Sequence, residues 1–272
     1  MNLDPDPAHP VVAVTGAGQG IGRGLAHAFA RAGMRVVVSD IRADAAEAVA
    51  RELREAGAQA LAQAADIGDA GDCAALADAA VRRFGRLDTM VCNAGLMQIR
   101  PLMELEASDW DRLLRVNVTG TFLSLQAAAR RMRQQEPSAP GQPRGRIIAM
   151  ASIAGRSGAG PIAGVIAPYR ASKAAVISLV QSAAVALAPE ITVNAICPGL
   201  VDTDMWKRMD RDWGALQGKA PGEIWRQRIE GIPMGRAQQP EDVAGLALYL
   251  ASPAAAYMTG QSINIDGGLM MN

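Results

Sequence analysis

Short runs of apolar and β-branched residues alternate along the chain with longer amphipathic stretches. Compact apolar runs predict buried strands, whereas apolar residues that recur every three or four positions predict helices. Ser108 is the expected N-cap of the long helix predicted at 109–132. The pattern predicts strands at 11–14, 34–39, 59–65, 87–92, 146–151, 191–196 and 262–265, and helices at 23–33, 44–56, 72–84, 109–132, 169–187 and 240–251.

Strands and helices alternate throughout, which predicts an α/β fold: a doubly wound parallel sheet of the Rossmann type, in three α/β/α layers. No compositional break marks a second domain in the 272 residues. We expect a disordered leader at 1–10 and a single domain at 11–272. The less regular segments are a surface connection at 136–145, a mobile loop at 153–168, and irregular or short helices at 200–239, which include a substrate lid at about 200–235.

Charge and composition narrow the classes of partner. The 27 basic and 27 acidic residues cancel, so no basic excess favours nucleic acid or an anionic membrane. Three widely spaced cysteines indicate a reducing compartment, and His9 and His27 lie near no other metal-ligand type, so we expect no metal site. The chain shows neither an apolar run of membrane-spanning length nor the pattern of a signal peptide, so we expect a cytoplasmic protein.

A cluster of glycines follows the first predicted strand, in the segment Thr15-Gly-Ala-Gly-Gln-Gly-Ile-Gly22. Glycines allow the backbone to approach a phosphate closely, and the free N–H groups of the next helix point at it. The spacing does not fit the simplest dinucleotide fingerprint, G-x-G-x-x-G, and a glycine-rich turn alone could be a loop without a ligand. Ligands of parallel sheets bind beyond the carboxyl ends of the strands. We therefore expect one crevice lined by this turn, Asp40, Asn93, Ser152 and Pro198, which all follow predicted strands.

Asp40 ends the second predicted strand, about 20 residues beyond the glycine turn. A carboxylate at this place can accept hydrogen bonds from both hydroxyls of an adenosine ribose, and it would repel a 2′-phosphate. Arg42 is nearby, but the glycine turn contains no basic residue. The sequence therefore predicts NAD over NADP, with a solvated turn aspartate as the alternative.

Tyr169 and Lys173 are four residues apart at the start of a predicted helix, so they share one face. Tyrosine is a poor base at neutral pH, but a neighbouring ammonium favours its phenolate. The pair could take a proton from an alcohol while hydride leaves the carbon. A purely structural pair is the alternative, and Ser152, whose hydroxyl can enter the same crevice, favours the catalytic interpretation. Asn117 could hold a local kink and a proton-relaying water, or be an ordinary polar helix residue.

With these residues in view, the chain resembles the short-chain dehydrogenase/reductase family from about Val11 to Gly268. The resemblance implies a catalytic tetrad of Asn117, Ser152, Tyr169 and Lys173. It also implies that Asp66 contacts adenine and that Pro198-Gly199 begins the segment that holds the nicotinamide. The residues predicted to contact the cofactor are Gly16, Gly18, Gln19, Gly20, Ile21, Gly22, Asp40, Ile41, Asp66, Ile67, Asn93, Ala94, Gly95, Tyr169, Lys173, Pro198, Gly199, Val201 and Thr203.

By this resemblance, Tyr169 is the general acid/base and Lys173 lowers its pKa and binds the nicotinamide ribose. Ser152 orients the substrate, and Asn117 supports a proton relay. Sixteen residues separate Ser152 from Tyr169, more than the dozen usual in the family. The extra length lies beside the substrate pocket, so the pocket shape cannot be carried over from the family.

The lid segment contains Trp206, Trp213 and Trp225 together with Met205 and Met209. These residues could form an apolar cover that excludes water, or they could simply pack short helices onto the body. The lid sequence is similar to that of bacterial polyol dehydrogenases acting on sorbitol or galactitol, and to acetoin/butanediol dehydrogenases.

The leading hypothesis is an NAD-dependent dehydrogenase of a secondary alcohol such as a polyol, sugar alcohol or vicinal diol. A 3-oxoacyl thioester reductase and a non-catalytic dinucleotide-binding sensor are the alternatives. The family commonly forms tetramers, and the apolar C-terminal residues Leu269, Met270 and Met271 would be poorly placed in water on a monomer. We therefore expect a homotetramer.

Overall fold

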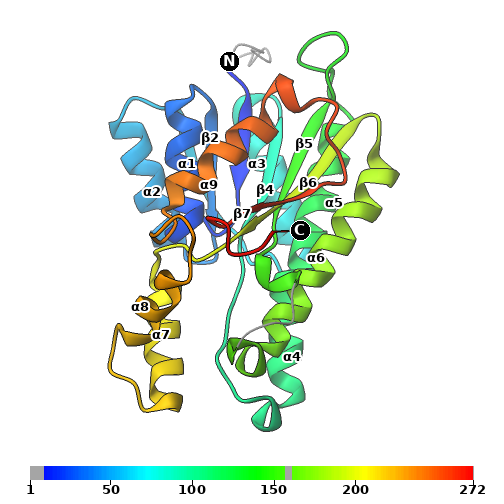
Figure 1. Cartoon of the computed structure of the whole chain (residues 1–272). Coiled ribbons are helices and arrows are strands. Elements are labelled where there is room, and N and C mark those ends of the chain that lie inside the picture. Colours follow the sequence, from blue (N-terminus) through cyan, green and yellow to red (C-terminus); the bar gives the residue numbers. More distant parts are fainter. Residues whose placement is uncertain (1–8, 157–160, 272) are drawn as a thin grey trace.

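The computed structural model describes residues 9–156 and 161–271 of the chain. The predicted leader lies outside the described residues except for its last two, of which Pro10 accepts a backbone hydrogen bond from Arg35 at 2.9 Å. Seven strands form one sheet, and every neighbouring pair is parallel. The strands are β1 (Val11–Val14), β2 (Arg35–Asp40), β3 (Ala60–Ala64), β4 (Thr89–Cys92), β5 (Gly145–Met150), β6 (Ile191–Pro198) and β7 (Ser262–Ile265) (Figure 1).

The strand order is β3-β2-β1-β4-β5-β6-β7. The chain starts in the middle of the sheet, runs outward to β3, and returns to place β4 on the other side of β1. This reversal creates a switch point between β1 and β4, where a crevice forms beyond the carboxyl ends of the strands. The predicted parallel Rossmann-type sheet is therefore confirmed.

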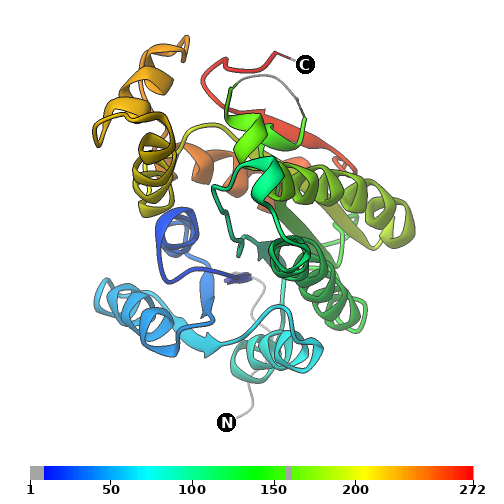
Figure 2. The ribbon, with the colours of Figure 1, turned by 90° about the horizontal axis from the view of Figure 1, so that it is seen from below.

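Helices cover both faces of the sheet, which gives the three predicted layers (Figure 2). One face carries α1, α2 and α9, and the other carries α3, α5 and α6. The helices are α1 (Gly20–Arg31), α2 (Ala43–Glu55), α3 (Ala70–Phe84), α4 (Ala107–Leu114), α5 (Gly120–Met132), α6 (Ala167–Leu187), α7 (Asp204–Gln217), α8 (Glu223–Glu230) and α9 (Pro240–Ala251). None of the described helices is long and apolar enough to cross a membrane.

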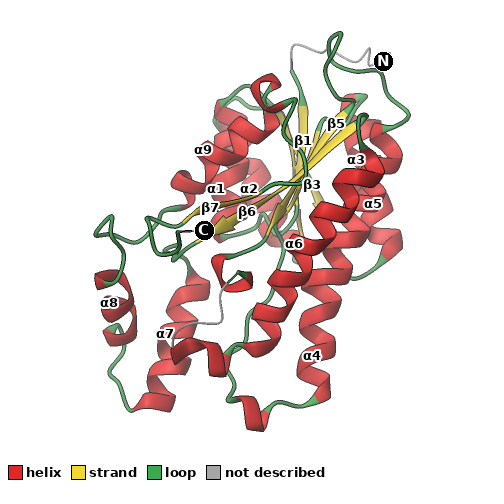
Figure 3. Cartoon of the chain, turned by 45° about the vertical axis from the view of Figure 1, so that its right-hand side comes forward, coloured by secondary structure: helices red, strands yellow, loops and turns green. Residues whose placement is uncertain are grey.

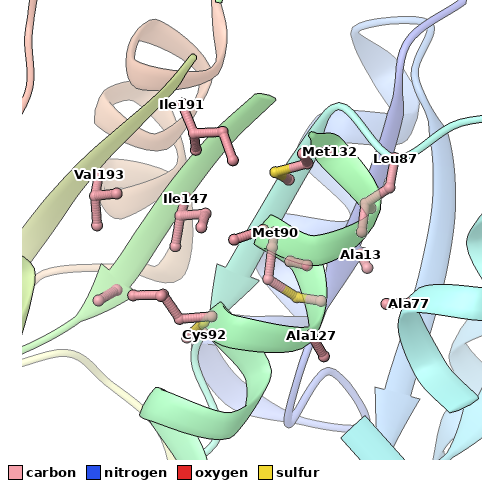
Figure 4. Packing of buried hydrophobic residues seen from close by; sticks show 14 of the residues in the cluster. Ala13, Ala77, Leu87, Met90, Cys92, Ala127, Met132, Ile147, Ile191 and Val193 are labelled. Carbon is pink, nitrogen blue, oxygen red and sulfur yellow. The ribbon is translucent and has the colours of Figure 1, made fainter. Parts of the chain in front are cut away.

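The core beneath α3, α5 and α6 shows why the strands contain nearly unbroken apolar runs. Sheet residues such as Met90 and Ile147 pack against alanine-rich helices, which come close to the sheet (Figure 4). At Gly145, an added Cβ would lie 2.3 Å from the Met132 sulfur, so this contact requires glycine. Strands that are buried on both faces favour such continuous apolar sequences over alternating ones.

The predicted helix at 109–132 is interrupted. A π-helical turn (Arg115–Thr119) separates α4 from α5. The N-cap prediction at Ser108 is wrong: Glu106 is the N-cap, and its N–H donates to the Asp109 carboxylate at 3.0 Å. Ser108 lies inside the first turn of α4, because the reciprocal pair of acidic side chains moves the start of the helix upstream.

The segment predicted as irregular or short helices and the segment predicted as a mobile loop both contain regular structure. Within 200–239, α7 is a fourteen-residue helix, and α7 and α8 project together beyond the sheet (Figure 3). Within 153–168, short 3₁₀ turns form at Ile153–Gly155 and Pro161–Val165, whereas 157–160 lie outside the described residues. Helix α6 begins at Ala167 and not at Tyr169, because Pro168 is compatible with the first helical turn.

Candidate active site

A cavity of about 510 Å³ lies beyond the carboxyl ends of the central strands, between the sheet and α7–α8. It brings together the glycine turn, Asp40, Asn93, Ser152 and Pro198, so the predicted single crevice is confirmed. Of the predicted site residues, Gly18 and Asn117 are outside its lining and contact lining residues from behind. The predicted residues in the lining are Gly16, Gln19, Gly20, Ile21, Gly22, Asp40, Ile41, Asp66, Ile67, Asn93, Ala94, Gly95, Ser152, Tyr169, Lys173, Pro198, Gly199, Val201 and Thr203.

The glycine turn forms the part of the cavity at the N-terminus of α1. Gly16 and Gly20 have positive φ angles of 61° and 54°, which glycine adopts without strain. At Gly18, an added Cβ would lie 2.7 Å from the Cβ of Ala45. The first N–H bonded inside this helix is that of Arg23, which donates to Gln19, so the preceding N–H groups remain available for an anion.

Thr15 connects this turn to the segment after β4, a role that the sequence analysis did not assign. Its hydroxyl oxygen accepts the N–H groups of Asn93 and Ala94 at 3.0 and 3.1 Å. The Asn93 amide in turn donates to the carbonyls of Thr15 and Gly16. These bonds fix the two sides of the switch point. The sequence signal that could have indicated this role is the hydroxyl of Thr15 directly before the first glycine of the turn.

Asp40 is buried and its carboxylate is fixed by backbone donors. One oxygen accepts the N–H of Gly18 at 3.0 Å, and the other accepts the N–H of Arg42 at 3.1 Å. The Arg42 guanidinium lies 3.9 Å from the carboxylate and is more than half exposed. The Asp40 carboxylate can therefore accept further hydrogen bonds from a group in the cavity. Asp40 is not a solvated turn residue.

Asp66 and Ile67 line the cavity after β3. The Asp66 carboxylate accepts the N–H of Gly68 at 2.8 Å and pairs with Arg115 of the π turn at 2.8 Å. Ile67 packs so closely on the helix that a Cβ at Gly120 would lie 2.6 Å from its side chain. The π turn is thus tied to this end of the cavity.

Tyr169, Ser152 and Lys173 come together at the other end. Burial raises the pKa of the Tyr169 phenol, and a hydrogen bond with the Ser152 side chain opposes this shift. Lys173 lies with its Nζ 5.7 Å from the centre of the Tyr169 ring and donates to the Met150 carbonyl at 2.7 Å. Burial lowers the pKa of Lys173 to about 8. Desolvation of the phenol is the largest influence on Tyr169, an effect that the sequence analysis left out.

Asn117 lies fully buried in the π turn. Its side-chain oxygen accepts the N–H of Leu96 at 2.7 Å, and its amide donates to the Leu96 carbonyl and to the Ser172 hydroxyl, each at 2.9 Å. An added Cβ at Gly95 would lie 3.3 Å from this oxygen and 3.5 Å from Lys173 Nζ, so both polar groups border the same space. Asn117 therefore lies where the α-helix is locally interrupted, next to Lys173. This position agrees with the prediction that Asn117 holds a local kink.

The C-terminal segment closes the cavity beside Pro198 and Gly199. The Asp266 carboxylate accepts the N–H groups of Gly268 and Met270 at 3.0 and 2.9 Å. This turn directs Leu269 and Met270 into the cavity lining. These two side chains, predicted to need cover from another subunit, are therefore partly covered within the chain.

Residues of the segment predicted as a lid both pack α7 onto the body and line the cavity, and Met209 does both. Met209 and Trp213 are buried in a cluster with Tyr169 and Leu113, so they pack α7 onto the body. Trp206 lines the cavity, and its ring lies 5.2 Å from that of Trp225 on α8.

A parallel sheet with a glycine turn at its switch point, and a buried tyrosine and lysine in the same cavity, is typical of a nicotinamide-dependent oxidoreductase. The chain belongs to the short-chain dehydrogenase/reductase family: the family model described as "Enoyl-(Acyl carrier protein) reductase" matches residues 16–270. It is an oxidoreductase of this family, whose members bind a nicotinamide dinucleotide.

Named relatives cover almost the whole chain. Sorbitol dehydrogenase of Cereibacter sphaeroides is 40% identical over 95% of this chain and 96% of its own. L-2,3-butanediol dehydrogenase of Corynebacterium glutamicum is 38% identical over 96% of this chain and 99% of its own. The structure of an actinorhodin polyketide ketoreductase variant with NADPH matches with a TM-score of 0.88 and 32% identity, over 98% of this chain and 99% of that one. The resemblance of the sequence to polyol and butanediol dehydrogenases is thus confirmed.

The residues present fit a dinucleotide. A side chain at Gly18 or Gly22 would force the glycine turn out of this shape, since an added Cβ would lie 2.7 Å from the Cβ of Ala45 or 2.3 Å from the carbonyl oxygen of Gly16. The open helix N–H groups suit a pyrophosphate, and the carboxylate of Asp40 suits hydroxyl donors. The cavity therefore has the open helix N–H groups, the Asp40 carboxylate and the Tyr169 group along one lining.

Proposed function

We propose that the protein is an NAD-dependent dehydrogenase of a secondary alcohol of the polyol, sugar alcohol or vicinal diol class. The observation that carries this proposal is the buried Tyr169 phenol, which lines the same cavity as Ser152, Lys173 and Asp40. The names of the relatives support the substrate class. The reaction converts the alcohol and oxidised cofactor to a ketone, reduced cofactor and one proton.

The proposed role of Tyr169 is proton transfer. When bound, the nicotinamide supplies or accepts the hydride at the reacting carbon. Tyr169 takes the hydroxyl proton in oxidation and returns it to the carbonyl oxygen in reduction. Ser152 donates a hydrogen bond to the same oxygen, and the positive charge of Lys173 favours the phenolate. Asn117, which borders the same space as Lys173, supports the onward proton relay.

The preference for NAD is proposed from Asp40. Because backbone donors fix its carboxylate, it can accept the ribose hydroxyls without reorganising, and it repels a 2′-phosphate. The remaining proposed cofactor contacts are those predicted from the sequence, with Gly199, Val201 and Thr203 at the nicotinamide end.

The test is a steady-state panel of sugar alcohols, vicinal diols and 3-oxoacyl thioesters with each cofactor. We expect kcat/KM with NAD to exceed that with NADP, and Asp40→Ala to reduce this ratio by at least about tenfold. Thioester reduction with NADPH alone would favour the reductase alternative. Cofactor binding without any turnover would favour the sensor alternative.

A further inference from the structure

Two arginines at the substrate end of the cavity have no part in the proposed reaction. Arg170 follows Tyr169 on α6, Arg228 lies on α8, and both line the cavity. Within residues 9–156 and 161–271, neither guanidinium forms an ion pair or a side-chain hydrogen bond. Both residues border the same cavity as Tyr169.

Each carboxylate that lines the cavity among the described residues has a cationic partner. Asp66 pairs with Arg115 at 2.8 Å, and Asp204, the acidic residue at the start of α7, pairs with Lys207 at 3.0 Å. No carboxylate therefore remains at the substrate end to neutralise Arg228, as far as the described residues extend. This end of the cavity has a net positive charge, although the chain as a whole is neutral.

Arg228 is partly withdrawn from water. Its Nε is buried without a hydrogen-bond partner among the described residues. Burial lowers the pKa of this guanidinium. The lining of the cavity also includes the apolar side chains of Trp206 and Met209. Buried donors in native proteins are almost always paired, so a donor of this kind beside a cavity is typical of a group that a ligand satisfies.

We propose that Arg228 and Arg170 form an anion subsite, which selects alcohols that carry a carboxylate or phosphate group beyond the reacting carbon. The planar fork of arginine matches both groups in a bidentate manner. This inference rests on the proposed dehydrogenase function and narrows its substrate class. Polyols with an acidic group, such as aldonic acids or polyol phosphates, are preferred over neutral polyols.

Binding of matched ligands tests the subsite directly. D-gluconate, sorbitol 6-phosphate and sorbitol are titrated calorimetrically into the protein, with and without saturating NADH. We expect at least one of the two anions to bind about tenfold or more tightly than sorbitol. We expect Arg228→Met to weaken that binding about 10- to 100-fold, the range for a charge-assisted hydrogen bond. The anion that responds more strongly identifies carboxylate or phosphate as the recognised group.

Arg226→Met is the matched control, because Arg226 is exposed on the same helix and does not line the cavity. It should leave the affinity for all three ligands unchanged. The subsite is ruled out if sorbitol binds as tightly as both anions, or if neither anion binds. The subsite is also ruled out if Arg228→Met weakens the binding of all three ligands equally, or if it weakens only the binding of NADH.

Turnover of the same compounds with NAD separates this inference from the proposed function. Arg228-dependent anion binding without turnover would refute the dehydrogenase proposal and leave the subsite intact. Turnover of sorbitol and gluconate at equal kcat/KM, with no change of their ratio in Arg228→Met, would refute the subsite and leave the dehydrogenase intact.

Discussion

At the scale of single residues, burial shifts the two ionisable groups at the end of the cavity in opposite directions. It raises the pKa of the Tyr169 phenol and lowers that of the Lys173 ammonium to about 8. Each shift favours the neutral form. At neutral pH, Tyr169 is therefore protonated, which is the form that donates to a carbonyl oxygen during reduction.

The raised pKa of Tyr169 predicts opposite pH dependences for the two directions of catalysis. Alcohol oxidation requires the phenolate, so its kcat/KM should rise with pH across the neutral and alkaline range. Ketone reduction requires the phenol, so its kcat/KM should fall. Steady-state rates in both directions, with NADH affinity measured at each pH as the control, check this. Oxidation that slows as the pH rises would contradict it.

The sequence predicted which residues the fold brings to the cavity, and it missed those whose role depends on a distant partner. Asp40, Ser152 and Tyr169 were predictable because each follows a strand or begins a helix, and the fold brings such positions together. Thr15 and Arg228 were not predictable, because the role of a hydroxyl or a guanidinium depends on the groups that lie next to it in the fold. The backbone N–H groups that donate to the Thr15 hydroxyl are 78 and 79 residues away in sequence.

At the scale of elements, the π turn between α4 and α5 is the feature that departs most from the predicted pattern. Apolar spacing is continuous across it, so the sequence predicts one helix. The buried hydrogen bonds of Asn117 to Leu96 and Ser172 give this turn partners that a regular helix would not require. π turns are frequent at functional sites, and this one borders the proposed active site.

Removal of the Asn117 side chain should therefore destabilise the fold. Asn117→Ala leaves the Leu96 N–H and carbonyl without these partners, which should reduce the free energy of unfolding by about 2–3 kcal/mol. Thr121→Val is the matched control, because it removes one hydrogen bond in the same turn and should cost about 1 kcal/mol. Urea denaturation measures both. Equal stability of Asn117→Ala and the wild type would show that the turn does not depend on this side chain.

At the scale of the whole molecule, the strand order and the C-terminal segment decide where the cavity lies. The alternation of strands and helices predicted the layers and the parallel sheet, since this connectivity has few solutions. It could not predict that Leu269 and Met270 turn back into the cavity, because the Asp266 carboxylate that holds this turn acts through backbone groups. The regular length of α7 was missed for a similar reason, since its apolar face is defined by Tyr169 and Leu113 of distant elements.

The homotetramer stays a prediction; of the three apolar C-terminal residues given for it, only Met271 is among the most exposed, and two further side chains join it. Val185 on α6, Tyr257 before β7 and Met271 are more than four-fifths exposed. Burial of such side chains between copies would remove apolar surface from water. Light scattering at micromolar concentration should give four times the mass of the chain. The mass of a single chain under these conditions would contradict the prediction.

The central claim is that the Tyr169 phenol transfers the proton of the reacting alcohol. Tyr169→Phe removes only the hydroxyl, so it tests this claim most directly when turnover and NADH affinity are measured on the same preparation. We predict a loss of kcat of about 100-fold or more, with NADH affinity within about twofold of the wild type. A variant that keeps most of its turnover would contradict the account.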